Sequence, residues 1–252
     1  MMVRRIYAFD VDGTLTPSRL KIDPEFEIFL LHFSKYEEVY LVTGSDKDKT
    51  IEQVGKEVWH AAAGCLQSCG NHIFVKGEEV YRNNWEPNED LIELLESFLK
   101  ISKWRTQTSN HIERRIGLVN FSVVGRDCTQ EQRDEYGKWD DGYGERLEFA
   151  KIINKSFPEL EASVGGQISI DIHPRGANKS QAKEWILKRH LANPIINFFG
   201  DKTLPGGNDY DLAKVLEGGF HKVYQVNDWK DTYRILMDLK LEDGWSPNDS
   251  IK

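Results

Sequence analysis

The sequence is poor in cysteine, in long hydrophobic runs and in net positive charge, and each shortage excludes a class of protein. Its three cysteines, Cys65, Cys69 and Cys128, are too few and odd in number for a disulfide framework, and they suit a reducing cytosol. No stretch approaches about eighteen uncharged apolar residues, so we expect no transmembrane segment and no membrane partner. The 33 basic residues are outnumbered by 41 acidic ones, for a net charge of −8, which argues against a general nucleic-acid binder.

The N-terminus and the overall composition indicate a packed cytoplasmic protein. An acidic motif begins at Asp10, and the residues before it leave no room for the apolar region and cleavage site of a signal peptide. The 39% hydrophobic fraction of the 252 residues is ample for one large core or two modest ones. We find neither internal repeats nor low-complexity segments.

The first eighty residues alternate between strand and helix patterns. The apolar run 3–9 predicts a buried strand, and residues 39–43 predict a second one. Between them, Asp23 and Pro24 mark the start of a helix. Its apolar residues follow the helical spacing and are Phe26, Phe29, Leu30 and Phe33. With a further helix predicted at 47–58, this β-α-β-α order is typical of a parallel, doubly wound sheet.

The pattern changes after about Arg82. Asn88 can cap a helix with one apolar face. Residues 116–124 and 168–172 alternate like strands, and the charged stretch 129–154 between them looks helical. Strands and helices that do not strictly alternate indicate an α+β module.

The α/β pattern returns at Asn178, which together with Gln181 resembles a capping box for a helix. Strands are predicted at 195–199 and 221–226, and a closing helix at 231–239, followed by a polar tail.

These patterns predict an α/β fold with an insertion. We expect a Rossmann-like, doubly wound parallel-sheet core formed by residues 1–82 and 178–252. Residues 83–177 would form an inserted α+β cap domain that determines substrate specificity.

Three predicted strands of the core end in polar residues. Ligands bind beyond the carboxyl ends of the strands in such sheets, which is where Asp10, Thr43 and Asp201 would lie. Asp12 and Asp209 lie close in sequence to the two aspartates, so the pocket would be rich in the oxygen ligands that Mg²⁺ prefers. A single such aspartate more often caps a helix. The combination of D-x-D-G-T, T-G-S, a helix-initial lysine and G-D followed by N-D is much rarer by chance.

The inserted module offers a second polar group. Along 168–172 the strand period of two places isoleucines on one face and Ser169 with Asp171 on the other, where they can hydrogen-bond a sugar. We expect three arginines of the module, Arg115, Arg126 and Arg133, to converge and bind a phosphate. A guanidinium group suits bidentate recognition of phosphate. The alternative is ordinary surface ion pairing of these arginines with neighbours such as Glu113, Asp127 and Glu131.

Taken in order, four motifs resemble those of the haloacid dehalogenase superfamily. They are Asp10-Val11-Asp12-Gly13-Thr14, Thr43-Gly44-Ser45, Lys179, and Gly200-Asp201 with Asn208-Asp209. The segment 198–209, Phe-Phe-Gly-Asp-Lys-Thr-Leu-Pro-Gly-Gly-Asn-Asp, is similar to the fourth motif of eukaryotic-type phosphomannomutases. The cap segments 115–126 and 165–171 are also similar to that family. The likeness runs from about Ile6 to about Asp211.

The resemblance implies a role for each residue of the core site. Asp10 would be the covalent nucleophile and Asp12 the general acid and base. Thr43 and Lys179 would stabilise the transferring phosphoryl group. Asp10, the backbone carbonyl of Asp12, and Asp201 would hold Mg²⁺. Asn208 and Asp209 would contact these ligands without binding the ion. Residues expected to bind substrate are Arg19, Arg115, Arg126, Arg133, Ser169 and Asp171.

The resemblance also implies substrates and partners. The expected reaction interconverts mannose 6-phosphate and mannose 1-phosphate through a hexose 1,6-bisphosphate, which also serves as activator, and supplies mannose 1-phosphate for GDP-mannose synthesis. Glucose phosphates stay open as further substrates, and the family resemblance implies a homodimer formed through the cap. Two alternatives remain: a Mg²⁺-dependent sugar-phosphate phosphatase on the same scaffold, and a catalytically silent sugar-phosphate-binding protein.

Overall fold

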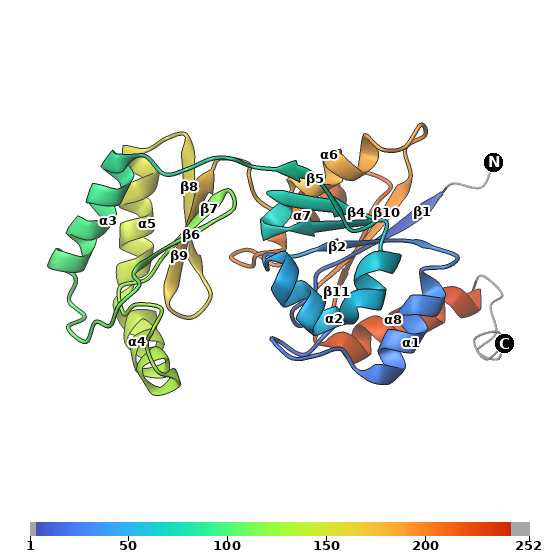
Figure 1. The fold of residues 1–252 in the computed structure, drawn as a ribbon, viewed down its shortest axis with the longest axis horizontal. Helices are drawn as coiled ribbons and strands as arrows, with labels where there is room; N and C mark the ends of the chain where they lie inside the picture. Colours follow the sequence, from blue (N-terminus) through green and yellow to red (C-terminus); the bar gives the residue numbers. More distant parts are fainter. Residues whose placement is uncertain (1–3, 243–252) are drawn as a thin grey trace. The chain divides into compact units, whose positions relative to one another are not determined.

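A computed structural model describes residues 4–242 of the chain (Figure 1). They fold into two compact units: the first extends to Arg82 and resumes at Asn178, and the second is Asn83–Ala177. We call them the core unit and the cap unit and describe each by itself.

A seven-stranded sheet forms the centre of the core unit, in the order β11-β10-β1-β2-β3-β4-β5. The strands from β11 to β3 pair in parallel, whereas β4 and β5 join antiparallel. The sequence patterns predicted β1, β2, β10 and β11, but neither β3 nor this terminal hairpin, whose tight turn at Lys76 and Gly77 has positive φ at both residues. The strands are β1 Arg5–Phe9, β2 Glu38–Val42, β3 Gly64–Gln67, β4 His72–Val75, β5 Glu78–Arg82, β10 Ile195–Gly200 and β11 Lys222–Gln225.

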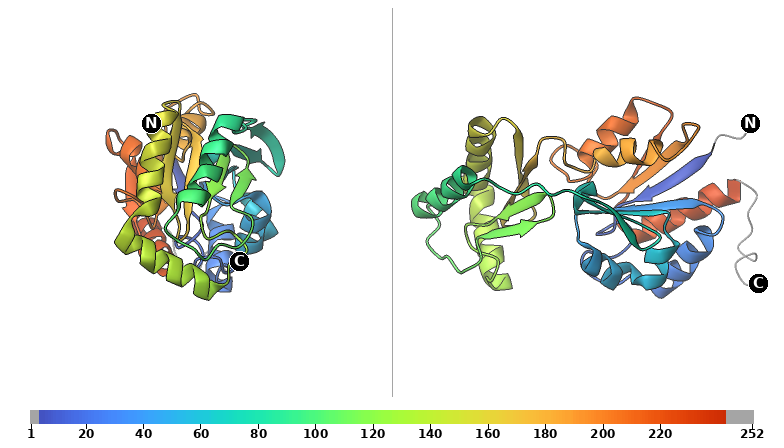
Figure 2. Two further views of the ribbon diagram at one scale, coloured as in Figure 1. Left: turned by 90° about the vertical axis from the view of Figure 1, so that its left-hand side faces the viewer. Right: turned by 45° about the horizontal axis from the view of Figure 1, so that its top comes forward.

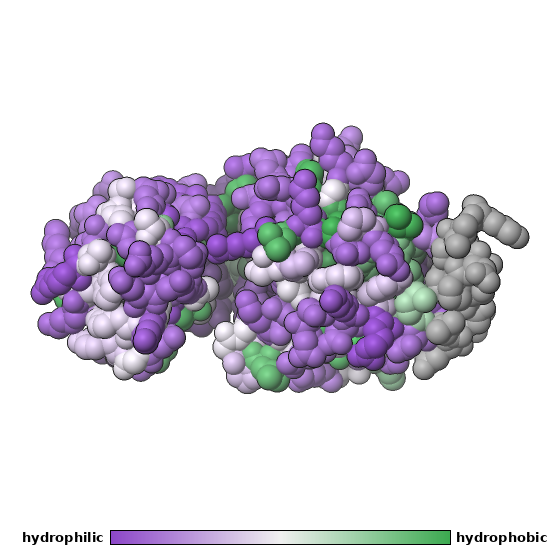
Figure 3. All heavy atoms as spheres, turned by 90° about the horizontal axis from the view of Figure 1, so that it is seen from below, coloured by the Kyte–Doolittle hydropathy of each residue, from purple (hydrophilic) through white to green (hydrophobic). Residues whose placement is uncertain are grey.

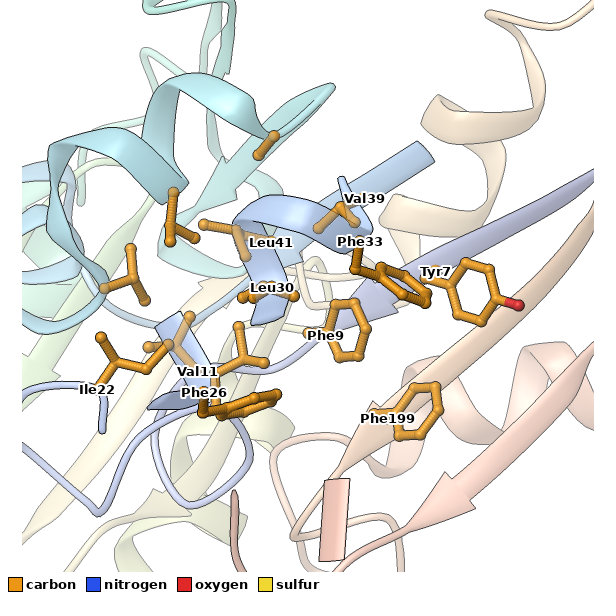
Figure 4. Close-up of a cluster of buried hydrophobic side chains, with 14 of the residues drawn as sticks. Tyr7, Phe9, Val11, Ile22, Phe26, Leu30, Phe33, Val39, Leu41 and Phe199 are labelled. Atoms are coloured by element: carbon orange, nitrogen blue, oxygen red, sulfur yellow. The ribbon is translucent and has the colours of Figure 1, made fainter. Parts of the chain in front are cut away.

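Helices cover both faces of the core sheet, so the unit is doubly wound (Figure 1). On one face lie α1 (Pro24–Phe33), α2 (Lys47–Ala61) and α8 (Trp229–Glu242), and on the other α6 (Gln181–Leu187) and α7 (Tyr210–Glu217). A short 3₁₀ helix spans Ser68–Gly70. Figure 4 shows how α1 supplies its predicted aromatic and aliphatic residues to the cluster under β1 and β2.

The start of α1 is as the sequence predicted, but the start of α6 is not. The carboxylate of Asp23 accepts the backbone N–H groups of Glu25 and Phe26, as an N-cap should. By contrast, the capping box expected at Asn178 is wrong. Its side-chain oxygen accepts the N–H and the hydroxyl of Ser180, at 2.9 and 2.6 Å, while the amide of Gln181 donates to the carbonyl of Cys69. Lys179 therefore lies in a turn that precedes the helix.

The cap unit is an α+β layer pair. Its antiparallel sheet has the order β6-β7-β9-β8, and α3 and α5 pack on one side of it (Figures 1 and 2). The strands are β6 Ile112–Arg115, β7 Leu118–Phe121, β8 Leu160–Gly165 and β9 Ser169–Pro174, and the helices are α3 Glu89–Ile101, α4 Gln130–Tyr143 and α5 Glu145–Ser156. The apolar residues of β7 and β9 face the helices, which leaves the polar residues of these strands on the opposite face.

Three details of the cap differ from the sequence prediction. The strand expected at 116–124 is a hairpin that turns at Ile116 and Gly117. The helix expected at 129–154 is two helices, because Gly144 adopts a left-handed conformation with φ of 76° and ends α4. Strand β8 was not predicted, although Asn88 caps α3 as expected.

The surface of the described residues is largely hydrophilic on the face drawn in Figure 3. None of the helices within residues 4–242 combines the length and the apolar character that a bilayer-spanning segment needs. The tail after Glu242, which we expected to be polar, lies outside the described residues.

Candidate active site

Asp10 follows the central strand β1 directly. Its backbone N–H donates to the carbonyl of Phe199 at 2.9 Å, which continues the β1–β10 ladder, and the residue is only 2% exposed. Because β1 pairs in parallel with both β2 and β10, the residues that follow these strands, Thr43 and Asp201, lie at the same edge of the sheet. The three strand ends predicted to form a site are therefore brought together.

Lys179 links two carboxylates in the interior. Its ammonium group is completely buried and lies 2.6 Å from Oδ1 of Asp10 and 2.6 Å from Oδ1 of Asp209. Burial alone would lower the pKa of Lys179, but the charges of the two carboxylates outweigh it and raise the pKa above its usual range. The lysine is therefore charged and fixes both aspartates.

Three carboxylates gather around this lysine. Oxygens of Asp10, Asp201 and Asp209 all lie within 4.8 Å of one another. Burial raises the pKa of Asp10 to about 7; Lys179 opposes the rise and the charge of Asp209 adds to it. Burial also raises the pKa of Asp201. In both cases burial is the main cause, and the charge of the neighbouring Asp209 adds to it.

The donor set fits a hard divalent cation. Carboxylate oxygens are the ligands that Mg²⁺ prefers. The lack of a side chain at Gly13 lets Asp201 lie close to the loop after β1, since a Cβ atom there would be 2.6 Å from Oδ2 of Asp201. Asp209 is less available, because its second oxygen accepts the backbone N–H of Lys202 at 3.1 Å. It ties the loop after β10 to Lys179, while Asn208 beside it is exposed.

Asp12 faces α2 instead of the acidic cluster. Its Oδ1 accepts the backbone N–H of Arg19 at 2.7 Å and the amide of Gln53 at 2.9 Å, and its Oδ2 lies 3.3 Å from both Ser45 Oγ and Lys49 Nζ. Burial would raise the pKa of Asp12, but these donors outweigh it and hold the pKa below its usual range. Asp12 is therefore a carboxylate at neutral pH.

The other two residues expected in the core site differ in exposure. Thr43 is 1% exposed, and its hydroxyl oxygen accepts the backbone N–H of Ser45 at 3.1 Å. Arg19 is exposed and has a positive φ of 63°. Its backbone N–H, not its guanidinium group, makes the contact with Asp12.

The polar face of the cap sheet carries a second charged group. Oε2 of Glu113 lies 2.7 Å from Arg115 Nη2 and 3.1 Å from Arg126 Nε, and Arg126 Nη1 lies 3.5 Å from Ser169 Oγ. Burial lowers the pKa of Arg126; Glu113 opposes this, and the nearby charges of Arg115 and Arg133 lower it further. The predicted arginines thus group together, and two of them also form the ion pair with Glu113 that was the alternative interpretation.

Asp171 belongs to the same face. The register pairs Glu113 with Asn120 and Asn120 with Asp171 across β6, β7 and β9. The amide of Asn120 donates to Oδ1 of Asp171 at 2.5 Å. Asn120 Oδ1 and Ser122 Oγ are among the buried side-chain oxygens of the described residues that have no hydrogen-bond partner. Both oxygens can therefore accept a further hydrogen bond.

Comparison with known families decides what kind of protein this is. A family model described as eukaryotic phosphomannomutase matches residues 26–241. The chain belongs to the eukaryotic phosphomannomutase family.

Individual phosphomannomutases agree with this assignment. The phosphomannomutase of Dendrobium officinale is 35% identical over 232 residues, which cover 88% of this chain and 90% of the relative. The phosphomannomutase of Saccharomyces cerevisiae is 32% identical over 239 residues, 92% of each chain.

Solved structures share the fold at lower identity. An IMP-nucleotidase of Plasmodium falciparum has a TM-score of 0.63 at 15% identity and covers 95% of this chain and 68% of that one. A haloacid dehalogenase-like hydrolase from Bacteroides thetaiotaomicron has a TM-score of 0.63 at 13% identity and covers 94% and 99%. This likeness confirms the predicted α/β class with a Rossmann-like core.

In this phosphomannomutase-family chain, sequence reasoning missed several residues that contact the predicted ones. Lys49 and Gln53 lie one turn apart on α2, directly after the T-G-S motif, and both reach Asp12. Their i, i+4 spacing at the start of a predicted helix was the signal available in the sequence. Asn120 carried a similar signal, because it lies on the polar side of a predicted strand.

Proposed function

We propose that this chain is a phosphomannomutase that interconverts mannose 6-phosphate and mannose 1-phosphate through an aspartyl-phosphate. The observation that carries the proposal is that a member of this family has an intact Asp10–Lys179–Asp209 arrangement in its core unit. The cap unit adds to it a pair of arginines held beside Glu113, with Arg133 close enough for its charge to act on Arg126. The first suits phosphoryl transfer and the second suits recognition of a phosphate.

Asp10 is the proposed nucleophile. Its oxygen would form a bond to phosphorus as the bond between phosphorus and the sugar oxygen breaks, giving an aspartyl-phosphate and a free hydroxyl. In the reverse step a sugar hydroxyl attacks that phosphorus and Asp10 leaves. Lys179 balances part of the negative charge in both directions and holds Asp10 in place.

Asp12 is the proposed proton carrier. Because its pKa lies below the usual range, it starts as a base and can take the proton of the sugar hydroxyl that attacks the phosphoenzyme. It then returns this proton to the leaving hydroxyl in the second transfer. Lys49 and Gln53 orient the carboxylate for this exchange.

Mg²⁺ is the cofactor we propose for the core site. Asp10, Asp201 and the backbone carbonyl of Asp12 would hold it, with Asp209 fixing Lys179 beside them. When bound, the ion neutralises charge on the transferring phosphoryl group. The excess of carboxylates over lysine in the cluster supports this assignment.

The cap residues would hold the phosphate that does not react. Arg115, Arg126 and Arg133 are the proposed phosphate ligands, and Ser169 with Asp171 would bind sugar hydroxyls. A grip on either phosphate of a hexose 1,6-bisphosphate would let both ends of the sugar reach Asp10. The use of glucose phosphates as further substrates stays open, and a bisphosphate activator, a homodimer and a cytoplasmic location stay predictions.

One incubation tests the proposal. The protein is mixed with mannose 1-phosphate and Mg²⁺, with and without a hexose 1,6-bisphosphate, and hexose 6-phosphate and inorganic phosphate are measured together. We expect hexose 6-phosphate to predominate and the bisphosphate to accelerate its formation. Predominant inorganic phosphate would instead assign a phosphatase, and the absence of both products would assign a binding protein without turnover.

A further inference from the structure

Glu113 pairs with two arginines that the proposed function gives to a phosphate. It lies two residues from Arg115 on β6, so both side chains project from the same face of the strand. Its Oε2 atom accepts a hydrogen bond from Arg115 Nη2 at 2.7 Å and lies at ion-pair distance, 3.1 Å, from Arg126 Nε. A single carboxylate oxygen therefore engages two guanidinium groups.

This contact has the same chemistry as a bound phosphate oxygen. Guanidinium N–H groups bind carboxylate and phosphate oxygens with the same donors. A phosphate that uses Arg115 Nη2 or Arg126 Nε must first displace Glu113. Displacement is feasible, because the Glu113 side chain is 35% exposed and can turn into solvent, while those of Arg115 and Arg126 are 33% and 22% exposed and accessible to a ligand.

We infer that Glu113 is an internal competitor for phosphate at the cap arginines and sets how tightly a hexose phosphate is held. The inference rests on the proposed function. A mutase of this kind must bind a bisphosphorylated sugar, let it turn around and bind it again at its other phosphate. A larger net positive charge at the three guanidinium ions would retard that release. The carboxylate of Glu113 lowers this charge by one, beside the charge of Asp171, which also acts on Arg126.

A purely structural role for Glu113 predicts the opposite result. If its carboxylate served only to hold the arginines in position, its loss would let three like charges separate and would weaken phosphate binding. A competitor, once removed, strengthens it. The sign of the change in affinity therefore distinguishes the two roles.

The test is Glu113→Gln, which removes the charge and keeps the size and one acceptor oxygen. Binding of inorganic phosphate to the full chain is measured by calorimetry in the presence of EDTA, so that the acidic core cluster, without metal, repels the probe. We expect the dissociation constant to fall about fivefold, the effect of a partly exposed ion pair near 1 kcal/mol. In the Mg²⁺ assay with mannose 1-phosphate we expect KM to fall and kcat not to rise.

Two controls confine the effect to the arginines. Glu96→Gln makes the same change of charge on the exposed surface of α3, whose apolar residues pack on the other side of the cap sheet, and should leave the phosphate affinity unchanged. In an Arg115→Ala, Arg126→Ala background, Glu113→Gln should lose most of its effect, because both guanidinium partners of Glu113 are gone. Glu113→Ser, which removes both charge and reach, should tighten binding as well, so the inference does not depend on one variant.

Equal or weaker phosphate binding by Glu113→Gln and Glu113→Ser overturns the inference, as does a gain that persists without both Arg115 and Arg126. The proposed function fails separately: wild-type protein that yields no hexose 6-phosphate contradicts the mutase assignment, whereas the phosphate affinities still decide whether Glu113 competes.

Discussion

At the scale of single residues, the buried ammonium group of Lys179 holds two carboxylates of the candidate active site together. It is the described partner of both Asp10 and Asp209 at 2.6 Å. Lys179→Met keeps the volume but leaves two buried carboxylates facing each other. We expect the free energy of unfolding to fall by about 3–5 kcal/mol, the usual cost of breaking a buried ion pair. Urea unfolding measures this loss.

A matched control and a metal titration sharpen that prediction. Lys188→Met removes an exposed lysine that pairs with Glu184 on α6, and it should cost below about 1 kcal/mol. If Mg²⁺ binds the carboxylates, adding it should restore part of the stability that Lys179→Met loses. A loss no larger than that of Lys188→Met would show that the buried pair does not hold the site together.

Asp10 is the residue whose chemistry is most directly testable. In Asp10→Asn the amide cannot form the aspartyl-phosphate, so we expect kcat to fall by at least about a thousandfold. The fold should persist, because Lys179 keeps Asp209 as a partner. Turnover is measured by hexose 6-phosphate formation and folding by thermal melting. Asp48→Asn, on the exposed surface of α2, should retain activity, and comparable activity in both variants would remove Asp10 as nucleophile.

How far the sequence predicted the site also depends on single residues. Asp10, Thr43 and Asp201 could be placed together, because parallel neighbouring strands end at one edge of a sheet. The direction of the Asp12 side chain could not, since it depends on Lys49 and Gln53 reaching back from the next helix. Strand and helix periodicity predicts on which face of an element a residue lies, but not which residues its side chain contacts.

At the scale of elements, one buried ion pair connects α4 to α5 where the two helices meet. Arg146 donates through Nε to Asp140 at 2.6 Å, and both side chains are 5% exposed. Its Nη1 also donates to the carbonyl of Gly166 in the turn before Ser169. We expect Arg146→Met to reduce the free energy of unfolding by about 3–5 kcal/mol, because Asp140 stays buried without its charged partner and keeps only the backbone N–H of residue 146. KM for hexose phosphates should rise as the turn loosens.

The control for this pair lies on the same helix. Lys151 and Glu148 form an exposed ion pair on α5, so Lys151→Met should change the free energy of unfolding by less than about 1 kcal/mol. Urea unfolding of both variants gives the comparison. Equal effects would mean that the buried pair contributes no more than a surface one.

We expect the stability of the junction between β10 and β11 to depend on pH through His221. The backbone N–H of Ile196 donates to its Nδ1 at 3.1 Å, which requires the neutral ring. Burial, helped by Lys183, lowers the pKa of His221 below the 6.5 of a free histidine. The unfolded chain therefore takes up the proton first, so this contribution to stability is complete above pH 6.5 and is lost as the pH falls through the lowered folded pKa.

His221→Asn tests this reading, because the amide oxygen can accept the same hydrogen bond without titrating. Between about pH 7.5 and about pH 5.5, urea unfolding should show the wild type losing stability relative to the variant. His60→Asn, an exposed histidine on α2, serves as the control. Parallel curves for wild type and His221→Asn would contradict the prediction.

Elements with strong local signals were predictable from sequence, and those set by single conformations were not. Helix α1 combines an Asp cap, a proline in its first turn and a regular apolar stripe, and each signal agrees with the others. The end of α4 rests on the left-handed conformation of Gly144 alone, in a charged segment with little periodicity. Strand β8 begins at Leu160 and has only one other buried residue, Ala162, so its apolar alternation was too short to detect.

At the scale of the whole molecule, the two units have separate apolar cores, and the proposed metal ligands all belong to one of them. Mg²⁺ binding should therefore stabilise the core unit selectively, by about 2.7 kcal/mol at a hundredfold excess over its dissociation constant.

Hydrogen exchange followed by mass spectrometry resolves the units: Mg²⁺ should slow exchange in β1 and β10 and leave β7 and β9 unchanged. Asp201→Asn should abolish the protection, because it removes a carboxylate without disturbing Lys179. Equal protection of both units would contradict a metal held by the core carboxylates, and no protection in either would leave the acidic cluster without the cation that its excess of negative charge calls for.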